Sequence, residues 1–498
     1  MHLSTLLDCD VVAVEQTDEL TLLVELTAPR PDVTTTRQPA TLQVVLDRSG
    51  SMAGDRLEGA KTALLALVDR LDPSDNLGVL AFDNTVQITV LAGPLTNKAS
   101  VKHAIASIEA GGATDLSGGY LRGLQEAQRV AGPGGATLLL ISDGHANAGV
   151  RDPDQLGQVA GAARTKGITT STLGFGLDYD EQILGALARG GSGNVLFAEE
   201  ADTAVAVISG QVDGLLNQVA QAASLRITWT PHVAGVQVLN DLPVVGLPDG
   251  VMVELGSFYA GETRRVLVKL DVPGIAALGL AQVATLEFTH VSQPDLVQHT
   301  TTVPVHVNVV PGDQAAGRVP DPVVRSEALF QQTQTAKREA SRLIREDRID
   351  DAWSLLHDAS ANLRAGSAAL PAALSGELFA EAALMDSIAA ESRIDARRAA
   401  KLSSVDSGTK SRTRGRQTTG QRVALHGLDG SELVLEEWEV MGLVRDLPRS
   451  LAGSLRPSVR TCDAGTAQGV ADALGADHAA HAFFAVAAAA GGFRVGRR

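Results

Sequence analysis

Short, mainly apolar runs alternate with helical patterns between Thr41 and about Leu216. The runs QVVL and TLLLI have the composition of strands buried on both faces of a parallel sheet. Segments between them repeat apolar residues at helical spacing. Strands are expected at 41–47, 76–82, 136–143, 168–176 and 194–199, and helices at 56–71, 117–131, 154–167 and 201–219. The pattern predicts an α/β fold with a doubly wound, mostly parallel sheet over residues 41–219.

The residue pattern divides the remaining chain into further regions. Residues 220–310 alternate β-branched and polar positions, which predicts an antiparallel β-sandwich. The strand-like residues of the segment 1–40 are expected to join it, so that the α/β domain is an insertion. We interpret 311–322 as a linker, 323–402 as a helical hairpin or three-helix bundle, and 403–498 as a low-complexity, largely disordered tail.

Composition limits the partners of this chain of 498 residues. Its net charge of −16 argues against general nucleic-acid binding, which needs a cationic surface. The exception is the basic segment 393–422, with nine Lys or Arg against two Asp, interpreted first as a solvated disordered tail and otherwise as a contact for an anionic partner or nucleic acid.

Location is judged from three features. The two cysteines, Cys9 and Cys462, match neither a disulfide framework nor a metal-ligand spacing. No signal peptide and no run of roughly 18 apolar residues is found, so no membrane contact is expected. We therefore expect a cytoplasmic protein.

Oxygen-bearing side chains occur at the ends of two predicted strands and in one further loop. Asp47, Ser49 and Ser51 lie in DRSGSM, Thr114 lies in GGATD, and Asp143 ends a buried run. Because ligands of open parallel sheets bind at the carboxyl ends of strands, these five side chains are expected to face one point. Carboxylates and hydroxyls suit Mg²⁺, which prefers oxygen and retains exchangeable water.

These motifs resemble the metal-ion-dependent adhesion site of von Willebrand factor type A domains, over about Thr41 to Val219. The resemblance implies that Ser49, Ser51 and Thr114 bind a divalent cation through hydroxyls, while Asp47 and Asp143 bind it directly or through water. It implies Mg²⁺ as the usual cation, with Mn²⁺ or Ca²⁺ as alternatives, and protein binding as the activity. The flanking regions resemble, more loosely, bacterial multidomain members of this family.

Several nearby residues have simpler interpretations. The Asp-x-Ser-x-Ser motif alone could be a helix cap. His145 is interpreted as a surface or supporting residue, Asp115 as a supporting group or the N-cap of a helix beginning near Ser117, and Asp83 as a strand-end cap.

Three functional classes follow. The favoured one is a non-enzymatic module that captures a Glu or Asp carboxylate of a partner protein through the bound metal. A scaffold beside an AAA+ ATPase is an alternative, as is a phosphoryl-transfer enzyme with Asp47 as nucleophile. Against the enzyme, Ser49 stands where a second carboxylate would be expected, and GGSGN lacks the Lys of a P-loop.

Overall fold

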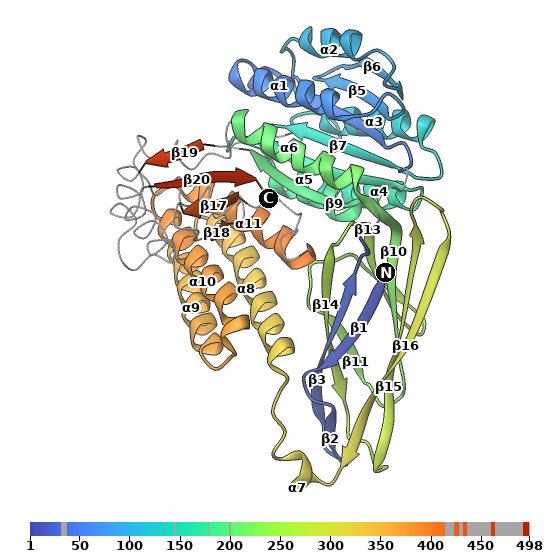
Figure 1. Cartoon of the computed structure of the whole chain (residues 1–498), viewed down its shortest axis with the longest axis vertical. Coiled ribbons are helices and arrows are strands. Elements are labelled where there is room, and N and C mark those ends of the chain that lie inside the picture. The colour runs from blue at the N-terminus through green and yellow to red at the C-terminus, as the bar shows by residue number, and fades with distance from the viewer. Residues whose placement is uncertain are drawn as a thin grey trace. The chain divides into compact units, whose positions relative to one another are not determined.

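The computed structural model describes residues 1–30, 37–143, 146–177, 179–198 and 201–413, together with four strands further along the chain. Residues 1–416 form one compact unit and residues 417–498 a second. The first unit contains an α/β domain, a β-sandwich and a helical region (Figure 1). Within the described ranges, no helix is long and apolar enough to cross a membrane.

The α/β domain is built on a six-stranded sheet in the order β6-β5-β4-β7-β8-β9. Its strands are β4 (Thr41–Asp47), β5 (Asn76–Phe82), β6 (Val86–Pro94), β7 (Ala136–Ser142), β8 (Ile168–Phe175) and β9 (Ser192–Ala198). All neighbours pair in parallel except β5 and β6, which are antiparallel. The predicted fold class is confirmed, and β4 and β7 are buried at every position, as their mainly apolar runs predict.

Helices cover both faces of this sheet (Figure 1). They are η1 (Gly50–Met52), α1 (Asp55–Arg70), α2 (Lys98–Ala106), α3 (Leu116–Val130), α4 (Pro153–Arg164), α5 (Glu181–Gly190) and α6 (Ala201–Leu216). One core joins α1, α2 and α6 to the sheet, and a second joins α3, α4 and α5 to its other face. Each strand therefore contributes alternate side chains to two apolar layers.

The sheet has a switch point between β4 and β7, its two central strands. From β4 the chain adds β5 on one side and then returns to add β7 on the other. The loops that follow β4 and β7 therefore diverge from one edge and leave a crevice between them, which is where open α/β sheets bind ligands.

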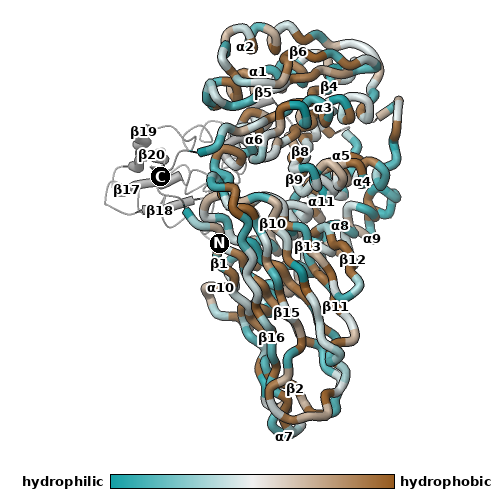
Figure 2. Tube along the Cα trace, turned by 90° about the vertical axis from the view of Figure 1, so that its right-hand side faces the viewer, coloured by the Kyte–Doolittle hydropathy of each residue, from teal (hydrophilic) through white to brown (hydrophobic). Residues whose placement is uncertain are grey.

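The β-sandwich contains two sheets, in the orders β1-β3-β14-β11 and β12-β13-β10-β15-β16-β2. Its strands are β1 (His2–Leu7), β2 (Val11–Ala13), β3 (Asp18–Thr27), β10 (Gln218–Trp229), β11 (Gly235–Val238), β12 (Val244–Leu247), β13 (Gly250–Tyr259), β14 (Thr263–Val272), β15 (Gly279–Ser292) and β16 (Gln298–Val310). Hydrophobic and hydrophilic positions alternate along β15 and β16 (Figure 2). One aliphatic core lies between the sheets.

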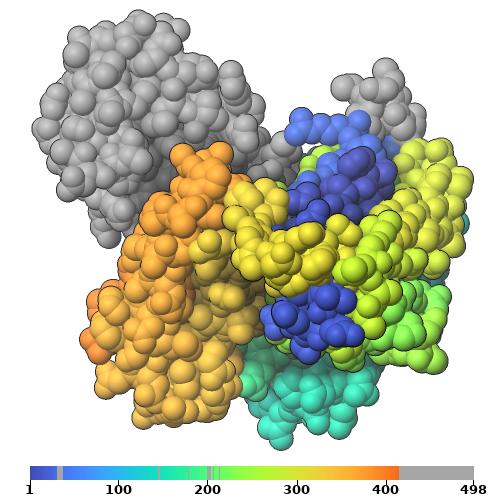
Figure 3. Space-filling view, turned by 90° about the horizontal axis from the view of Figure 1, so that it is seen from below, coloured from blue at the N-terminus to red at the C-terminus, as the bar shows by residue number. Residues whose placement is uncertain are grey.

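The sandwich is formed by the chain segments that precede and follow the α/β domain. β3 precedes that domain in sequence but pairs with β14 along ten residues, and β2 pairs with β16. Seen from below, the N-terminal residues, in blue, lie between yellow and green residues from beyond position 220 (Figure 3). The chain passes from α6 into β10 with only Asn217 between them.

The helical region contains four long helices, where the sequence pattern predicts a hairpin or three-helix bundle. After the short α7 (Gly312–Ala315) come α8 (Pro322–Arg345), α9 (Ile349–Ser367), α10 (Ala372–Ser392) and α11 (Ala396–Thr413). The predicted boundary at residue 402 therefore falls inside α11. The expected disordered tail is wrong for residues 403–413, because Ser403, Ser407 and Ser411 pack as small buried residues in this bundle.

The basic segment 393–422 is correspondingly structured as far as Thr413. Lys401 pairs with Glu181 of the α/β domain, and Lys410 pairs with Glu381 of α10. These cations serve contacts within the chain, so the interpretation of this part as a solvated tail is wrong. The rest of the segment, 414–422, lies outside the described residues.

The second unit contains four described strands in the predicted tail. They are β17 (Val423–Gly427), β18 (Glu432–Leu435), β19 (Arg460–Asp463) and β20 (Gly492–Arg497), which pair antiparallel in the order β18-β17-β20-β19. These residues are therefore not the disordered tail that their composition predicts.

Candidate metal centre

Two aspartates mark the adjacent strand ends at the switch point. Asp47 is the last residue of β4, and Asp143 directly follows β7. Both side chains are fully buried. Register explains their proximity, because Leu46 of β4 pairs with Ile141 of β7 and the parallel strands end together.

The loop after β4 folds back over these carboxylates. The backbone N–H of Ser49 donates to Asp47 Oδ1 at 2.8 Å, which fixes the turn. Ser51 Oγ lies 3.2 Å from Ser49 Oγ and donates to Asp143 Oδ1 at 2.9 Å. The structure thus brings four of the five predicted ligands into one hydrogen-bonded group.

A residue that the sequence analysis did not single out completes the link between the two strands. Ser142 Oγ, at the end of β7, donates to Asp47 Oδ2 at 2.6 Å. Asp47 is therefore held from both of its oxygens, by its own loop and by the neighbouring strand.

Thr114, the fifth predicted ligand, lies on a loop that is hydrogen-bonded to the loop after β4 and to the loop after β7. The N–H of Gly50 donates to the carbonyl of Gly112 at 3.1 Å, which joins this loop to the one after β4. The N–H of Thr114 donates to Asn147 Oδ1 at 2.8 Å, and the N–H of Asn147 donates back to the Thr114 carbonyl at 3.1 Å. Thr114 itself is buried. The three loops therefore form one cross-bonded assembly.

Gly112 makes this approach possible. Its φ of +61° lies in the left-handed region, and a Cβ there would stand 2.3 Å from Asn84 Oδ1 and 2.8 Å from Asp83 Cγ. A side chain at this position would force the Thr114 loop away from the sheet edge.

Electrostatics at the two carboxylates favour a bound cation. Burial raises the pKa of Asp47, and the nearby charge of Asp143 raises it too, while hydrogen bonds from Ser142 and Ser49 lower it; the net change is upward. Two buried carboxylates this close repel each other when both are ionised, so a positive charge between them stabilises the charged forms.

One cation already present near the site is the guanidinium of Arg56, on the first turn of α1. Its Nη1 donates to Asp143 Oδ2 at 2.5 Å, and the Arg56 side chain is about one third exposed while Asp143 is not exposed at all. The sequence gives no sign of this pair, because Arg56 stands in an ordinary amphipathic helix far from Asp143 in the chain.

The donor set fits a hard divalent cation. It comprises two carboxylates and three hydroxyl-bearing residues, all oxygen donors, as Mg²⁺ prefers. Among the described residues no group of three or more His, Cys, Asp or Glu side chains is arranged to hold a metal, so a site for a softer metal is not found there.

Asp115 and Asp83 act as caps in the structure rather than as predicted metal ligands. Asp115 caps α3 by accepting from the N–H of Gly118, as predicted. Asp83 caps the end of β5 by accepting from the N–H of Thr85 at 2.7 Å, also as predicted, and in addition pairs with Arg48. His145 lies outside the described residues.

Comparison with known sequences identifies the α/β domain. The family model of the von Willebrand factor type A domain matches residues 42–211. An uncharacterised protein of Synechocystis is 30% identical over 260 residues, which cover 50% of this chain and 61% of that protein. The uncharacterised protein YfbK of Escherichia coli is 30% identical over 195 residues, 38% of this chain and 34% of its own length. The matches thus span under two thirds of these relatives.

Solved structures match over a larger part of the chain. A von Willebrand factor type A protein from Catenulispora acidiphila aligns with a TM-score of 0.60 at 16% identity, over 78% of this chain and 96% of its own. The ArnB paralog VWA2 from Sulfolobus acidocaldarius aligns with a TM-score of 0.57 at 17% identity, over 83% and 98%. At these identities the likeness concerns the fold, and it extends beyond the α/β domain.

Proposed function

We propose that the von Willebrand factor type A domain of this chain, residues 42–211, is a non-enzymatic module that binds a partner protein in a divalent-metal-dependent manner. The observation that carries the proposal is the bonded group of Asp47, Ser49, Ser51 and Asp143 at the switch point. Buried carboxylates bridged by hydroxyls at a ligand-binding edge are the arrangement that an oxygen-coordinated cation requires.

Five residues would hold the cation. Asp47 and Asp143 supply the negative charge, and Ser49, Ser51 and Thr114 supply neutral oxygens. The five residues would leave a bound Mg²⁺ with an exchangeable coordination position, which an acidic group of a partner can fill. We therefore propose a Glu or Asp carboxylate of the partner as the group that is recognised.

A role without catalysis is proposed on the character of the loop after β4. The side chain two residues beyond Asp47 is Ser49, which already orders the turn through its backbone bond to Asp47. Asp47 accepts a hydrogen bond at each of its oxygens, so its side chain is restrained and its lone pairs are engaged, which disfavours a nucleophilic attack.

The experiment begins with the metal itself. Mg²⁺ and Mn²⁺ binding to the purified chain is measured by titration calorimetry for the native protein, Asp47→Asn and Thr114→Ala. One saturable site is expected, with affinity reduced at least tenfold in each variant, since each loses a charged or hydroxyl ligand. The matched control is Asp69→Asn at the far end of α1, which removes an exposed carboxylate and is expected to bind metal normally.

Partner binding is tested next with the same variants. Proteins retained in Mg²⁺, lost in EDTA and lost with Asp47→Asn are expected, and acidic residues of a retained partner should be needed. A partner held equally in EDTA and by both variants would contradict the proposal. Turnover of small phosphate esters that Asp47→Asn abolishes would instead favour the phosphoryl-transfer alternative.

A further inference from the structure

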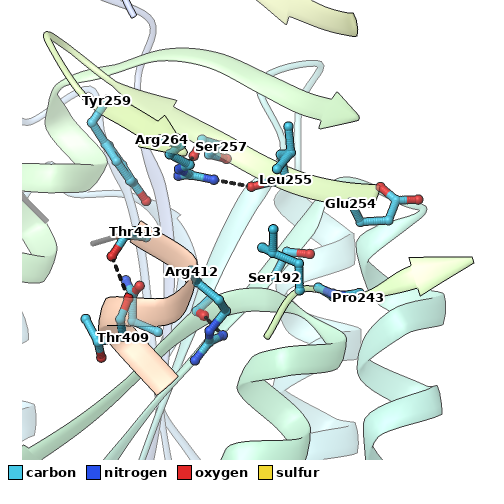
Figure 4. A pocket seen from close by; sticks show the side chains of 13 residues that line it. Ser192, Pro243, Glu254, Leu255, Ser257, Tyr259, Arg264, Thr409, Arg412 and Thr413 are labelled. Carbon is cyan, nitrogen blue, oxygen red and sulfur yellow. Dashed lines mark hydrogen bonds between the residues drawn. The ribbon is translucent and has the colours of Figure 1, made fainter. Parts of the chain in front are cut away.

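A small pocket lies where three parts of the first unit meet. It is lined by Ser192 of β9, by Glu254 and Ser257 of β13, and by Thr409 and Arg412 of α11, among others. Figure 4 shows α11 with Thr409, Arg412 and Thr413 on one side and the strand carrying Leu255 and Ser257 across from it. The α/β domain, the sandwich and the helical region all contribute to this pocket.

Arg412 is the residue that requires explanation. It is only 8% exposed. Its guanidinium donates to the carbonyls of Gly408 and Gly193, each at 2.8 Å, and forms no ion pair with any residue that the structure describes. A buried guanidinium held by carbonyls alone retains its full charge, which is costly away from water.

Neighbouring charges increase this cost. The pKa of Arg412 is lowered to about 10, chiefly by burial; Asp241 opposes the fall, and the guanidiniums of Arg189, Arg264 and Arg338 add to it. Asp241 itself lies 3.8 Å from Arg189, within ion-pair distance. Arg338 also has a buried Nη1 without a hydrogen-bond partner.

The other charged groups of the pocket are already paired. Arg264 is neutralised by Glu262, with a hydrogen bond of 2.8 Å from Nε to Oε1. Glu254 pairs with Arg164 at 2.6 Å, so its charge is engaged on the side of α4. Of the charged residues that line the pocket, Arg412 is therefore the one without an ion pair to a described residue.

Ser192 provides an independent sign of a missing ligand. Its Oγ is buried and has no hydrogen-bond partner. Its φ of +53° is in the left-handed region, which a serine adopts at some cost. Gly256 on the facing strand permits the close approach, since a Cβ there would lie 3.0 Å from Ser192 Cβ. A strained residue with an unused buried hydroxyl thus lines the same pocket as a buried guanidinium that has no ion pair with any described residue.

We propose that this pocket binds a small tetrahedral oxyanion of the phosphate or sulfate class, with Arg412 as its cation and Ser192 as a neutral donor. The anion would supply the missing negative charge. It would accept a charge-assisted hydrogen bond from Arg412 and a neutral one from Ser192. The free space in the pocket is small, about 30 Å³, so it excludes a nucleotide or a peptide. Because all three parts supply lining residues, the anion would stabilise their junction.

Titration calorimetry and thermal unfolding of the full chain test this proposal, with EDTA present so that the metal centre does not contribute. The probe is inorganic phosphate, compared with sodium chloride at equal ionic strength. One saturable site and a raised Tm are expected in phosphate, and sulfate should displace it. Binding should weaken at least roughly tenfold in Arg412→Gln and severalfold in Ser192→Ala. The matched control, Arg226→Gln, removes an exposed guanidinium from β10 and should bind phosphate normally.

The outcomes separate clearly. If Arg412→Gln does not fold, Ser192→Ala decides, because it removes one hydroxyl and keeps the backbone strain. Saturable binding that Ser192→Ala weakens supports the site. Absence of saturable phosphate binding, which means that water alone occupies the pocket, overturns it, as do unchanged binding in both variants and acetate binding as tight as phosphate.

Discussion

Arg56 and Asp143, 87 residues apart in sequence, form an ion pair of 2.5 Å in which the carboxylate is completely buried. The guanidinium therefore neutralises one of the two acids that we propose as metal ligands. A fixed positive charge at this position opposes a second one brought by a metal ion, so Arg56 is expected to set how tightly the site binds its cation.

Replacing Arg56 by Gln should raise Mg²⁺ affinity by about tenfold, because a competing charge is removed in partly screened surroundings. Arg56→Lys keeps the charge and should stay near the native affinity. The control is Lys102→Gln, which removes an equal charge from an exposed pair with Asp69. Weaker Mg²⁺ binding by Arg56→Gln in calorimetry would instead show that the guanidinium orients Asp143 for the metal.

Glu327 on α8 should make the protein less stable as pH rises. Burial raises its pKa from 4.5 to about 7, with Glu377 and Glu25 adding to the rise and Arg265 and Gln331 opposing it. Between these pH values the folded chain keeps a proton that the unfolded chain has lost, so this group lowers the free energy of unfolding as pH increases.

The variant Glu327→Gln stays neutral and should remove this loss, with a gain on the order of 2–3 kcal/mol at pH 8 relative to pH 4.5. Urea denaturation at both pH values measures it. Glu109→Gln, at an exposed position, serves as the control and should show no such difference. An equal effect of Glu327→Gln at both pH values would contradict the prediction.

Glu381 should stabilise the helical region through two ammonium groups, of the buried Lys337 and the partly buried Lys410. It accepts from Lys337 and, at 2.6 Å, from Lys410, and these contacts hold its pKa well below the ordinary range despite burial. Glu381→Gln leaves both lysines with Asp406 alone, so the free energy of unfolding should fall by about 3 kcal/mol at pH 7.

This loss should shrink as the pH is lowered below the ordinary pKa of a glutamate, since a carboxylate with a depressed pKa stabilises only while it is ionised in the folded state. Denaturation of Glu339→Gln, which breaks a half-exposed pair with Arg342, provides the comparison and should change stability by less than about 1 kcal/mol. Equal losses in the two variants would show that burial does not strengthen the Glu381 contacts.

Two helical glycines of the α/β domain should respond in opposite directions to alanine. A Cβ at Gly123 of α3 would stand 2.3 Å from Val45 Cγ2, so Gly123→Ala should destabilise the domain by about 1–3 kcal/mol. At Gly185 of α5 the nearest atom is 4.0 Å away, so Gly185→Ala should stabilise by about 0.5–1 kcal/mol. Thermal unfolding of the two variants checks both signs.

Much of the α/β fold was predictable because its strands are buried on both faces. Mainly apolar runs identify β4 and β7, and the aspartates at or just after their ends indicate the site. The edge strand β6 is half exposed and carries no such run, and the short α5 contains two glycines, so neither was predicted.

Other features depend on contacts between distant segments. The pairing of Arg56 with Asp143 arises only when α1 is placed over the sheet edge. Helix α11 has the serines and lysines of a solvated tail, yet Lys401 finds Glu181 and the serines fill tight packing positions. Composition could not predict this order, because the partners of these residues lie on other elements.

Asn217 is the single residue between α6 and β10, so the connection between the inserted domain and the sandwich is too short to extend. β10 is hydrogen-bonded on both sides, to β13 and to β15, so the sheet holds it in place. Any sliding of α6 along its axis must therefore pull on the middle of that sheet or unravel the end of the helix itself.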